Sequence, residues 1–237
     1  MDRRTYRAGV AACAGIALAA VAAAPARAAT SWALLSTPNR GTTANELYGG
    51  AALSPTSAWA VGSWYDNNLA AARTLVERWN GTAWTQVTAP DPGTSGNSLE
   101  AVAGVAADDV WAVGSKNGYH EAVAYHWNGS AWSEVPTPAP PAGSGNNVLY
   151  VAAATASNQV WAVGYTSSGS DRQPLVIRWN GTAFATETVP RQQFGGTLAA
   201  VAATSGPTVF AAGTRTDFSS DLGAFTDHTL SVRGSGS

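Results

Sequence analysis

Trp59-Ala60-Val61-Gly62 recurs as Trp111-Ala112-Val113-Gly114 and Trp161-Ala162-Val163-Gly164, and in altered form as Phe210-Ala211-Ala212-Gly213. The leading aromatic residues are 52, 50 and 49 residues apart. A leucine precedes each of them by twelve residues, at Leu47, Leu99, Leu149 and Leu198. A constant register at this period indicates four copies of one structural unit.

Each copy is predicted to hold four short strands, and the second copy shows this most clearly. Its predicted strands are residues 99–106, 110–115, 122–127 and 131–135. Asn128-Gly129 separates the last two, and this dipeptide is typical of a type I′ hairpin turn. The same Trp-Asn-Gly sequence occurs at Trp79 and Trp179, and an aromatic residue follows each of the three Trp five positions later, at Trp84, Trp132 and Phe184.

Four antiparallel strands repeated about every fifty residues are typical of propeller blades. We therefore predict an all-β, four-bladed β-propeller within residues 29–237. The predicted blades span residues 47–89, 99–137, 149–189 and 198–237.

The two ends of the repeat region complement each other. Leu230-Ser231-Val232-Arg233 aligns with the third strand of the copy before it, so the last copy lacks its fourth strand. Residues 31–37 align with the fourth strands of the other copies, with Trp32 in the place of Phe184. We predict that this N-terminal strand completes blade 4 and closes the ring, which removes exposed sheet edges.

The first 28 residues read as a secretory signal peptide. Arg3 and Arg4 precede an Ala-rich apolar run, and Ala26 and Ala28 suit a cleavage site before Ala29. Either the general or the twin-arginine route fits, and both place the mature protein outside the cytoplasm. The one cysteine, Cys13, lies in the removed segment. No disulfide or thiol chemistry is therefore expected in the mature domain.

The charge of the mature chain argues against nucleic acid and membranes as partners. Residues 1–28 hold four of the 13 Lys and Arg and one of the 15 Asp and Glu, which leaves nine basic and 14 acidic residues and a formal charge of −5. The basic residues are scattered. No footprint for nucleic acid or an anionic membrane is expected, and no membrane insertion after cleavage.

The Trp-Ala-Val-Gly and Trp-Asn-Gly-Thr repeats resemble secreted actinobacterial β-propellers, which are loosely similar to kelch and galactose-oxidase-like propellers. That resemblance implies a scaffold used for carbohydrate recognition or protein binding, sometimes as a subunit of a larger secreted complex. The kelch Gly-Gly doublet has no fixed position here, so no kelch binding residue is carried over.

Recognition residues are expected in the loops between the second and third strands, because these loops vary while the turns at the other end are nearly constant. Aromatic rings beside Asn and Asp suit a sugar, whose C–H face stacks on a ring while its hydroxyls need donors and acceptors. In the alternative, the rings merely pack on the blades. The candidate ligand-binding residues are Trp64, Tyr65, Asp66, Asn67, Tyr119, His120, Tyr165, Asp171 and Phe218.

No catalytic, metal or cofactor motif stands out in the mature chain. It has neither a G-x-S-x-G nor an H-E-x-x-H sequence. His120 and His126 share a strand face, but His126 occupies the repeat position of Arg78 and Arg178. We predict a non-catalytic, lectin-like or protein-binding module without cofactor or metal. The alternatives are a structural subunit of a secreted assembly or, less favoured, a glycan-active hydrolase or lyase using loop carboxylates such as Asp66, Asp171 and Asp217.

Overall fold

The computed structural model of the protein describes residues 32–92, 95–140, 145–206 and 208–235. The predicted signal peptide and Cys13 lie outside the described residues. The chain divides into two units, Met1–Leu34 and Leu35–Ser237, and the fold described below is that of the second unit.

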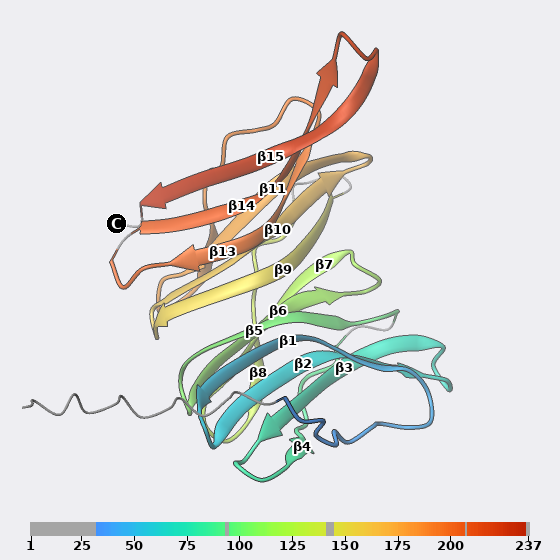
Figure 1. Ribbon diagram of the computed structural model, residues 1–237, viewed down its shortest axis with the longest axis vertical. Helices are drawn as coiled ribbons and strands as arrows, with labels where there is room; N and C mark the ends of the chain where they lie inside the picture. Colours follow the sequence, from blue (N-terminus) through green and yellow to red (C-terminus); the bar gives the residue numbers. More distant parts are fainter. Residues whose placement is uncertain (1–31, 93–94, 141–144, 207, 236–237) are drawn as a thin grey trace, which may run out of the picture. The chain divides into compact units, whose positions relative to one another are not determined.

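The described residues form fifteen β-strands in four antiparallel sheets (Figure 1). Three sheets have four strands and the last has three. The first sheet contains β1 (Asn45–Ser54), β2 (Ser57–Asp66), β3 (Ala71–Trp79) and β4 (Trp84–Gln86). The second contains β5 (Ser98–Ala106), β6 (Asp109–Lys116), β7 (Glu121–Trp127) and β8 (Trp132–Val135). The third contains β9 (Gly145–Ala156), β10 (Gln159–Ser168), β11 (Asp171–Trp179) and β12 (Phe184–Thr186), and the fourth β13 (Gly196–Ala203), β14 (Thr208–Ser219) and β15 (Ala224–Ser235).

Each predicted repeat corresponds to one sheet, and in each sheet the strands pair in sequence order. In the second repeat, every predicted strand boundary falls within one residue of the observed one. The all-β class and the four blade-like sheets predicted from the repeat are therefore confirmed.

The Asn-Gly turns differ from the predicted type I′ geometry. Trp127 pairs with Trp132, so four residues form the turn, and Gly129 has a φ of +94° while Asn128 is not left-handed. The Asn128 side chain explains the difference, because its Oδ1 accepts bonds of 3.0 Å from the backbone N–H groups of Ser130 and Ala131. The asparagine therefore stabilises the turn through its side-chain oxygen, and only the glycine adopts a positive φ.

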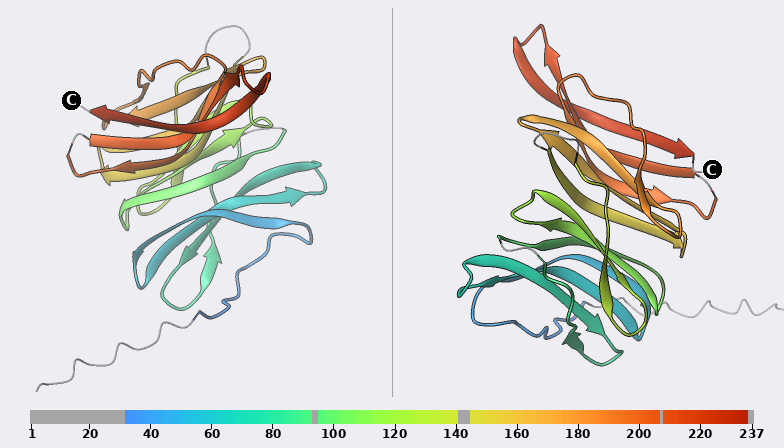
Figure 2. Two further views of the ribbon diagram at one scale, coloured as in Figure 1. Left: turned by 45° about the horizontal axis from the view of Figure 1, so that its top comes forward. Right: turned by 180° about the vertical axis from the view of Figure 1, so that it is seen from behind.

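The core lies between consecutive sheets. One buried cluster joins the first sheet to the second, another the second to the third, and a third the third to the fourth. The sheets follow one another in sequence order in both views of Figure 2. Their innermost strands β1, β5, β9 and β13 contact one another in series. None of the core clusters found among the described residues joins the fourth sheet to the first.

A β-bulge interrupts the innermost strand at the same position of every repeat. The pairing register shifts at the residue after each repeated leucine. The four bulged residues are Tyr48, Glu100, Tyr150 and Ala199. The bulge brings the inner backbone so close to Gly114 that a Cβ there would lie 2.0 Å from the carbonyl oxygen of Ser98. The glycine of the Trp-Ala-Val-Gly motif is thus required by this close approach.

The fourth sheet is one strand short in the described residues, as the alignment of the last repeat predicts. Residues 32–40 form no strand in the structure, and no described strand pairs with the outer edge of β15. Closure of the ring by residues 31–37 therefore stays a prediction.

Candidate functional site

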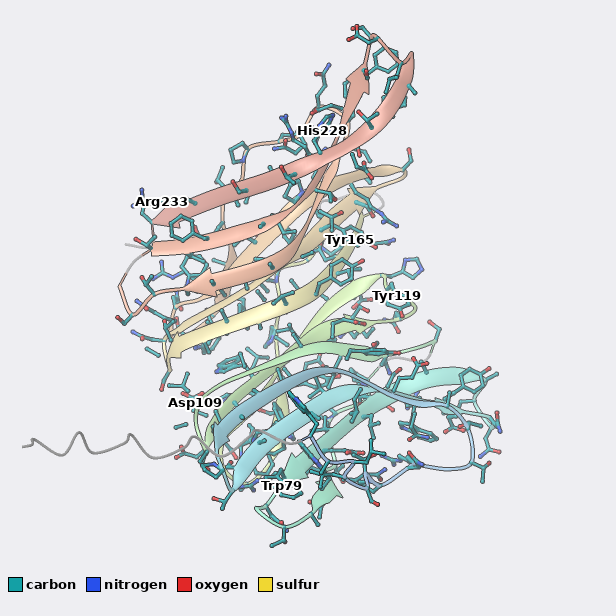
Figure 3. The ribbon with its side chains drawn as sticks, viewed as in Figure 1. Trp79, Asp109, Tyr119, Tyr165, His228 and Arg233 are labelled. Atoms are coloured by element: carbon teal, nitrogen blue, oxygen red, sulfur yellow. The ribbon has the colours of Figure 1, made fainter. Side chains whose placement is uncertain are left out.

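All four loops between the second and third strands of a sheet lie at one end of the strands, called here the loop end. Antiparallel pairing fixes this arrangement, because the first strands of the sheets, β1, β5, β9 and β13, run in the same sense (Figure 1). Figure 3 shows Tyr119 and Tyr165 at the loop end, while Asp109, the first residue of β6, lies at the opposite end.

A cavity of about 400 Å³ opens at the loop end between the first two sheets. Tyr65 and Tyr119 stand in its lining with 41% and 53% of their surfaces exposed. We call this cavity the loop pocket. It is lined by Tyr65, Leu69, Ala70, Ala71, Ala72, Ser95, Gly96, Asn97, Ser98, Ser115, Gly118 and Tyr119.

The polar lining of the loop pocket is held in place by the segment that leads into β5. Asn97 is buried and its side-chain amide donates to Asp91 Oδ1 over 2.6 Å. The Ser98 hydroxyl donates to Glu100 Oε1 over 2.7 Å. Gly118 N–H donates to the carbonyl oxygen of Gly96 over 2.9 Å, which ties the β6–β7 loop to this segment. The pocket therefore combines exposed rings with fixed hydroxyl, amide and backbone groups.

The backbone beside the loop pocket adopts conformations that L-residues rarely take. Ala70 and Tyr119, both in the lining, have φ values of +49° and +71°, and Asn117 next to Gly118 has +55°. A positive φ is unusual for a bulky aromatic residue and costs on the order of 1 to 3 kcal/mol. Such strained positions cluster at functional sites, so the position of the Tyr119 ring is maintained at a cost to stability.

The bulges add a second group of side chains next to the loop pocket, and we call this group the inner cluster. Tyr119 lies within electrostatic range of Glu46 and Glu100 on β1 and β5, and of Tyr165. The other members are Tyr48, which donates to Glu46 and lies 3.2 Å from the Ser63 hydroxyl, and Tyr150, whose ring centre is 5.8 Å from that of Tyr165. Bulges commonly re-aim side chains near binding sites.

Sequence reasoning missed most of the inner cluster, because Glu46, Tyr48, Glu100 and Tyr150 lie on inner strands and not in loops. A signal was present: the residue after the repeated leucine changes from Tyr to Glu to Tyr to Ala, while the two residues that follow it are always Gly, Ala or Val. Variation at one position of a constant repeat marks a residue that the scaffold does not require.

The tyrosines of the inner cluster keep their protons well above neutral pH. Burial raises the pKa of Tyr119, and the carboxylates of Glu100 and Glu46 raise it further. Burial likewise raises the pKa of Tyr150 and of Tyr48, the latter with a contribution from Glu46. These hydroxyls are therefore neutral hydrogen-bonding groups.

Two of the predicted site residues on the first sheet serve its own structure. The Trp64 ring is half-buried under Arg40, whose guanidinium carbon lies 4.9 Å from the ring centre. Asp66 Oδ1 accepts the backbone N–H of Asn68 over 2.9 Å and so caps its own turn. Asn67 is exposed at the tip of the same turn.

The remaining predicted residues are spread over three sheets. His120 Nδ1 lies 2.7 Å from Asn146 Oδ1, and Tyr165 is buried beneath Arg172, 4.6 Å from the ring centre. Asp171 pairs with Arg191. Phe218 packs on Phe225, with 5.3 Å between ring centres. Of the nine predicted residues, the loop pocket brings together Tyr65 and Tyr119.

The described residues hold no group of three or more His, Cys, Asp and Glu placed to bind a metal ion. His126 instead stacks on Trp111 and bonds Asp109 over 2.9 Å, in the way that Arg78 and Arg178 lie over Trp59 and Trp161. Within the described part of the chain, no helix is long and apolar enough to cross a membrane.

No family model matches the sequence, and no curated protein matches it. Among solved structures, the chain is similar to one described as "YCF48 bound to D1 peptide", with 13% sequence identity and a TM-score of 0.46. The similarity covers 78% of this chain and 54% of the other, so the chain spans about half the length of that protein.

Proposed function

We propose that this protein is an exported, non-catalytic recognition module that binds a glycan in the loop pocket. One observation carries the proposal: Tyr65 and Tyr119, from two different sheets, stand exposed in one cavity of about 400 Å³ lined by serine, asparagine and glycine. A cavity of this size suits a small ligand such as one or two sugar rings.

The chemistry of the lining favours a sugar over a purely apolar ligand. Each tyrosine ring offers a face for the C–H groups of a pyranose, and each hydroxyl offers a hydrogen bond. The Ser98 hydroxyl and backbone groups of the β6–β7 loop add polar groups at the pocket wall, while the buried Asn97 side chain, bonded to Asp91 and Asn117, holds that wall in place. Glu46 and Glu100 lie beside the pocket, and the mature chain is acidic, so the ligand is expected to be neutral or basic and not a polyanion.

The arrangement of the loop carboxylates Asp66 and Asp171 does not favour a glycosidase. Asp66 is engaged by its own turn and Asp171 by Arg191, and they belong to the first and third sheets. A glycosidase needs two carboxyl groups within about 5 to 10 Å of each other across the scissile bond, one of them free to exchange protons. The competing functions are binding of a protein partner and a structural role in a secreted assembly. The experiment below distinguishes glycan binding from these two.

The test is titration of the exported protein with neutral cell-wall polysaccharides and their oligosaccharides, after a glycan array has identified the class. Tyr65→Ala and Tyr119→Asn should each weaken binding by about 1 to 3 kcal/mol. Asn tolerates the left-handed backbone at position 119, so this change removes the ring and keeps the turn.

Phe218→Ala is the matched control, because Phe218 is a similarly exposed ring (49%) near the tip of the corresponding β14–β15 hairpin of the fourth sheet and does not line the pocket. Its affinity should equal that of the wild type. An array and polysaccharide panel without any binding would overturn the glycan proposal. Equal losses in all three variants would place the ligand elsewhere on the loop end.

A further inference from the structure

Consecutive sheets meet through one repeated aromatic contact. Trp59 on β2 packs against Trp127 and Trp132 of the second sheet, with ring centres 5.0 and 5.1 Å away. At the next junction Trp111 packs against Trp179 and Phe184 at 5.0 and 5.5 Å. In both cases the two receiving rings come from the end of the third strand and the start of the fourth.

Among the residues that the structure describes, the fourth sheet supplies neither receiving ring to the third junction. Trp161 is the equivalent of Trp59 and Trp111, but the fourth sheet places Gly234 at the end of its third strand, paired with Val209 as Trp127 is with Val110. A cavity of about 240 Å³ occupies this place, and Trp161, Val209 and Gly234 line it. The cavity adjoins the outer edge of β15, which no described strand covers.

The first and the fourth sheet each expose side chains that are packed in the aromatic contact at the complete junctions. Phe210 on the fourth sheet, the equivalent of Trp59, is 53% exposed. On the first sheet Trp79 and Trp84, the equivalents of Trp127 and Trp132, are only half-buried. Leu47 is 41% exposed, whereas its three repeat equivalents are fully buried. Trp79 and Arg233, which pairs with Phe210, mark these two end sheets in Figure 3.

The segment before β1 has the sequence of the missing fourth strand. Trp32 precedes Pro38 by six residues, as Trp84, Trp132 and Phe184 precede Pro90, Pro138 and Pro190. Trp32 and Leu34 are fully exposed. The residues that follow are held on the first sheet, because Gln86 Nε2 donates to the Pro38 carbonyl over 3.2 Å and Arg40 lies over Trp64.

We infer that the fourth sheet of one chain receives the first sheet of a second copy, together with the strand Trp32–Thr37 that precedes it. The incoming strand pairs with the free edge of β15 and Trp32 fills the cavity beside Trp161. Phe210 then packs between Trp79 and Trp84 of the second copy, which repeats the contact seen at the two complete junctions.

A second copy fits this surface better than the same chain does. The six residues 32–37 span at most about 20 Å, and Pro38, which follows them, is hydrogen-bonded to the first sheet. A strand formed by these residues can therefore pair only with a sheet that lies next to the first sheet. Within one chain, none of the core clusters of the described residues joins the first and fourth sheets. Because each copy has one donating and one receiving end, two copies satisfy both contacts at once and close into a ring of eight sheets.

The first test is the mass of the exported protein in solution, by light scattering and sedimentation at micromolar concentration. We expect a dimer. Trp32→Ala and Phe210→Ala should each raise its dissociation constant at least about tenfold. Leu222→Ala is the control, because it removes a 70% exposed apolar side chain at the far tip of the β14–β15 hairpin and should leave the dimer unchanged. A monomer at all concentrations, or open filaments, would overturn the proposal.

A pair of introduced cysteines distinguishes the assembly of two copies from closure of the ring within one chain. Ala185 pairs with Arg178, so Ala33 is expected opposite Arg233 of the receiving sheet. The mature chain has no cysteine of its own, and the double variant Ala33→Cys, Arg233→Cys should give a covalent dimer on a non-reducing gel. A disulfide-linked monomer would show that the chain closes on itself and would overturn the two-copy assembly.

Discussion

Trp111 lies edge-on to Phe184 of the next sheet, with ring planes at 89° and ring centres 5.5 Å apart. Its other face stacks on His126 of its own sheet at 4.4 Å. One residue thus connects the packing within a sheet to the packing between sheets. The sequence repeat of the aromatic residue follows from this double role.

Trp111→Ala should lower the free energy of unfolding by about 3 to 5 kcal/mol, because it opens a cavity in a junction where the side chain is 1% exposed. Chemical denaturation of the variant measures this directly. A loss below about 1 kcal/mol would mean that the junctions do not rely on these rings.

Gly114→Ala should destabilise the protein although it adds a single methyl group. The new Cβ would meet the Ser98 carbonyl oxygen and the Leu99 Cα at 2.0 and 2.8 Å, and backbone cannot move aside as a flexible side chain does. We expect a loss at or above the upper end of the about 1 to 3 kcal/mol typical of overpacking. Gly169→Ala is the control, because a Cβ at position 169 would meet no atom of the described residues within 4 Å beyond its two chain neighbours, although the positive φ of this residue adds some strain. A variant at position 114 as stable as the wild type would contradict the close approach at the bulge.

Glu77→Gln should stabilise the protein at neutral pH. Glu77 is 1% exposed, its Oε2 has no hydrogen-bond partner, and burial raises its pKa. A carboxyl group with a raised folded pKa contributes most to stability below its unfolded pKa, and this contribution is lost as the pH rises through the folded value. The free energy of unfolding of the wild type should therefore fall as the pH rises from the unfolded to the folded pKa of Glu77. Glu77→Gln lacks this fall, and its free energy of unfolding should exceed that of the wild type by about 1 to 3 kcal/mol at pH 7. Unfolding curves from pH 4 to 8 give the answer, and parallel profiles for the two proteins would contradict it.

Trp64→Ala separates the two roles predicted for this residue. The ring is half-buried beneath Arg40, whose guanidinium carbon lies 4.9 Å from the ring centre, so its removal takes away this packing. We expect a stability loss of about 1 to 2 kcal/mol with glycan affinity unchanged. Thermal melting and titration calorimetry on one sample decide between the roles, since a stable variant with weakened binding would assign Trp64 to the ligand.

The sequence alone determined the repeated unit and its strands, because strand alternation, turn glycines and the Trp-Ala-Val-Gly motif act over short distances along the chain. It also predicted Tyr65 and Tyr119 at a common end of the strands, since antiparallel order decides that without any knowledge of packing, although Tyr65 lies in β2 and not in the predicted loop. The tertiary structure alone decided which loop residues share a cavity. It joined Tyr65 to Tyr119, placed Trp64 under Arg40 and engaged Asp171 with Arg191. It also revealed Tyr48, Glu100 and Tyr150, because a bulge changes the direction of a side chain through pairing with a neighbouring strand, and pairing between strands is not written in the spacing of residues along one strand.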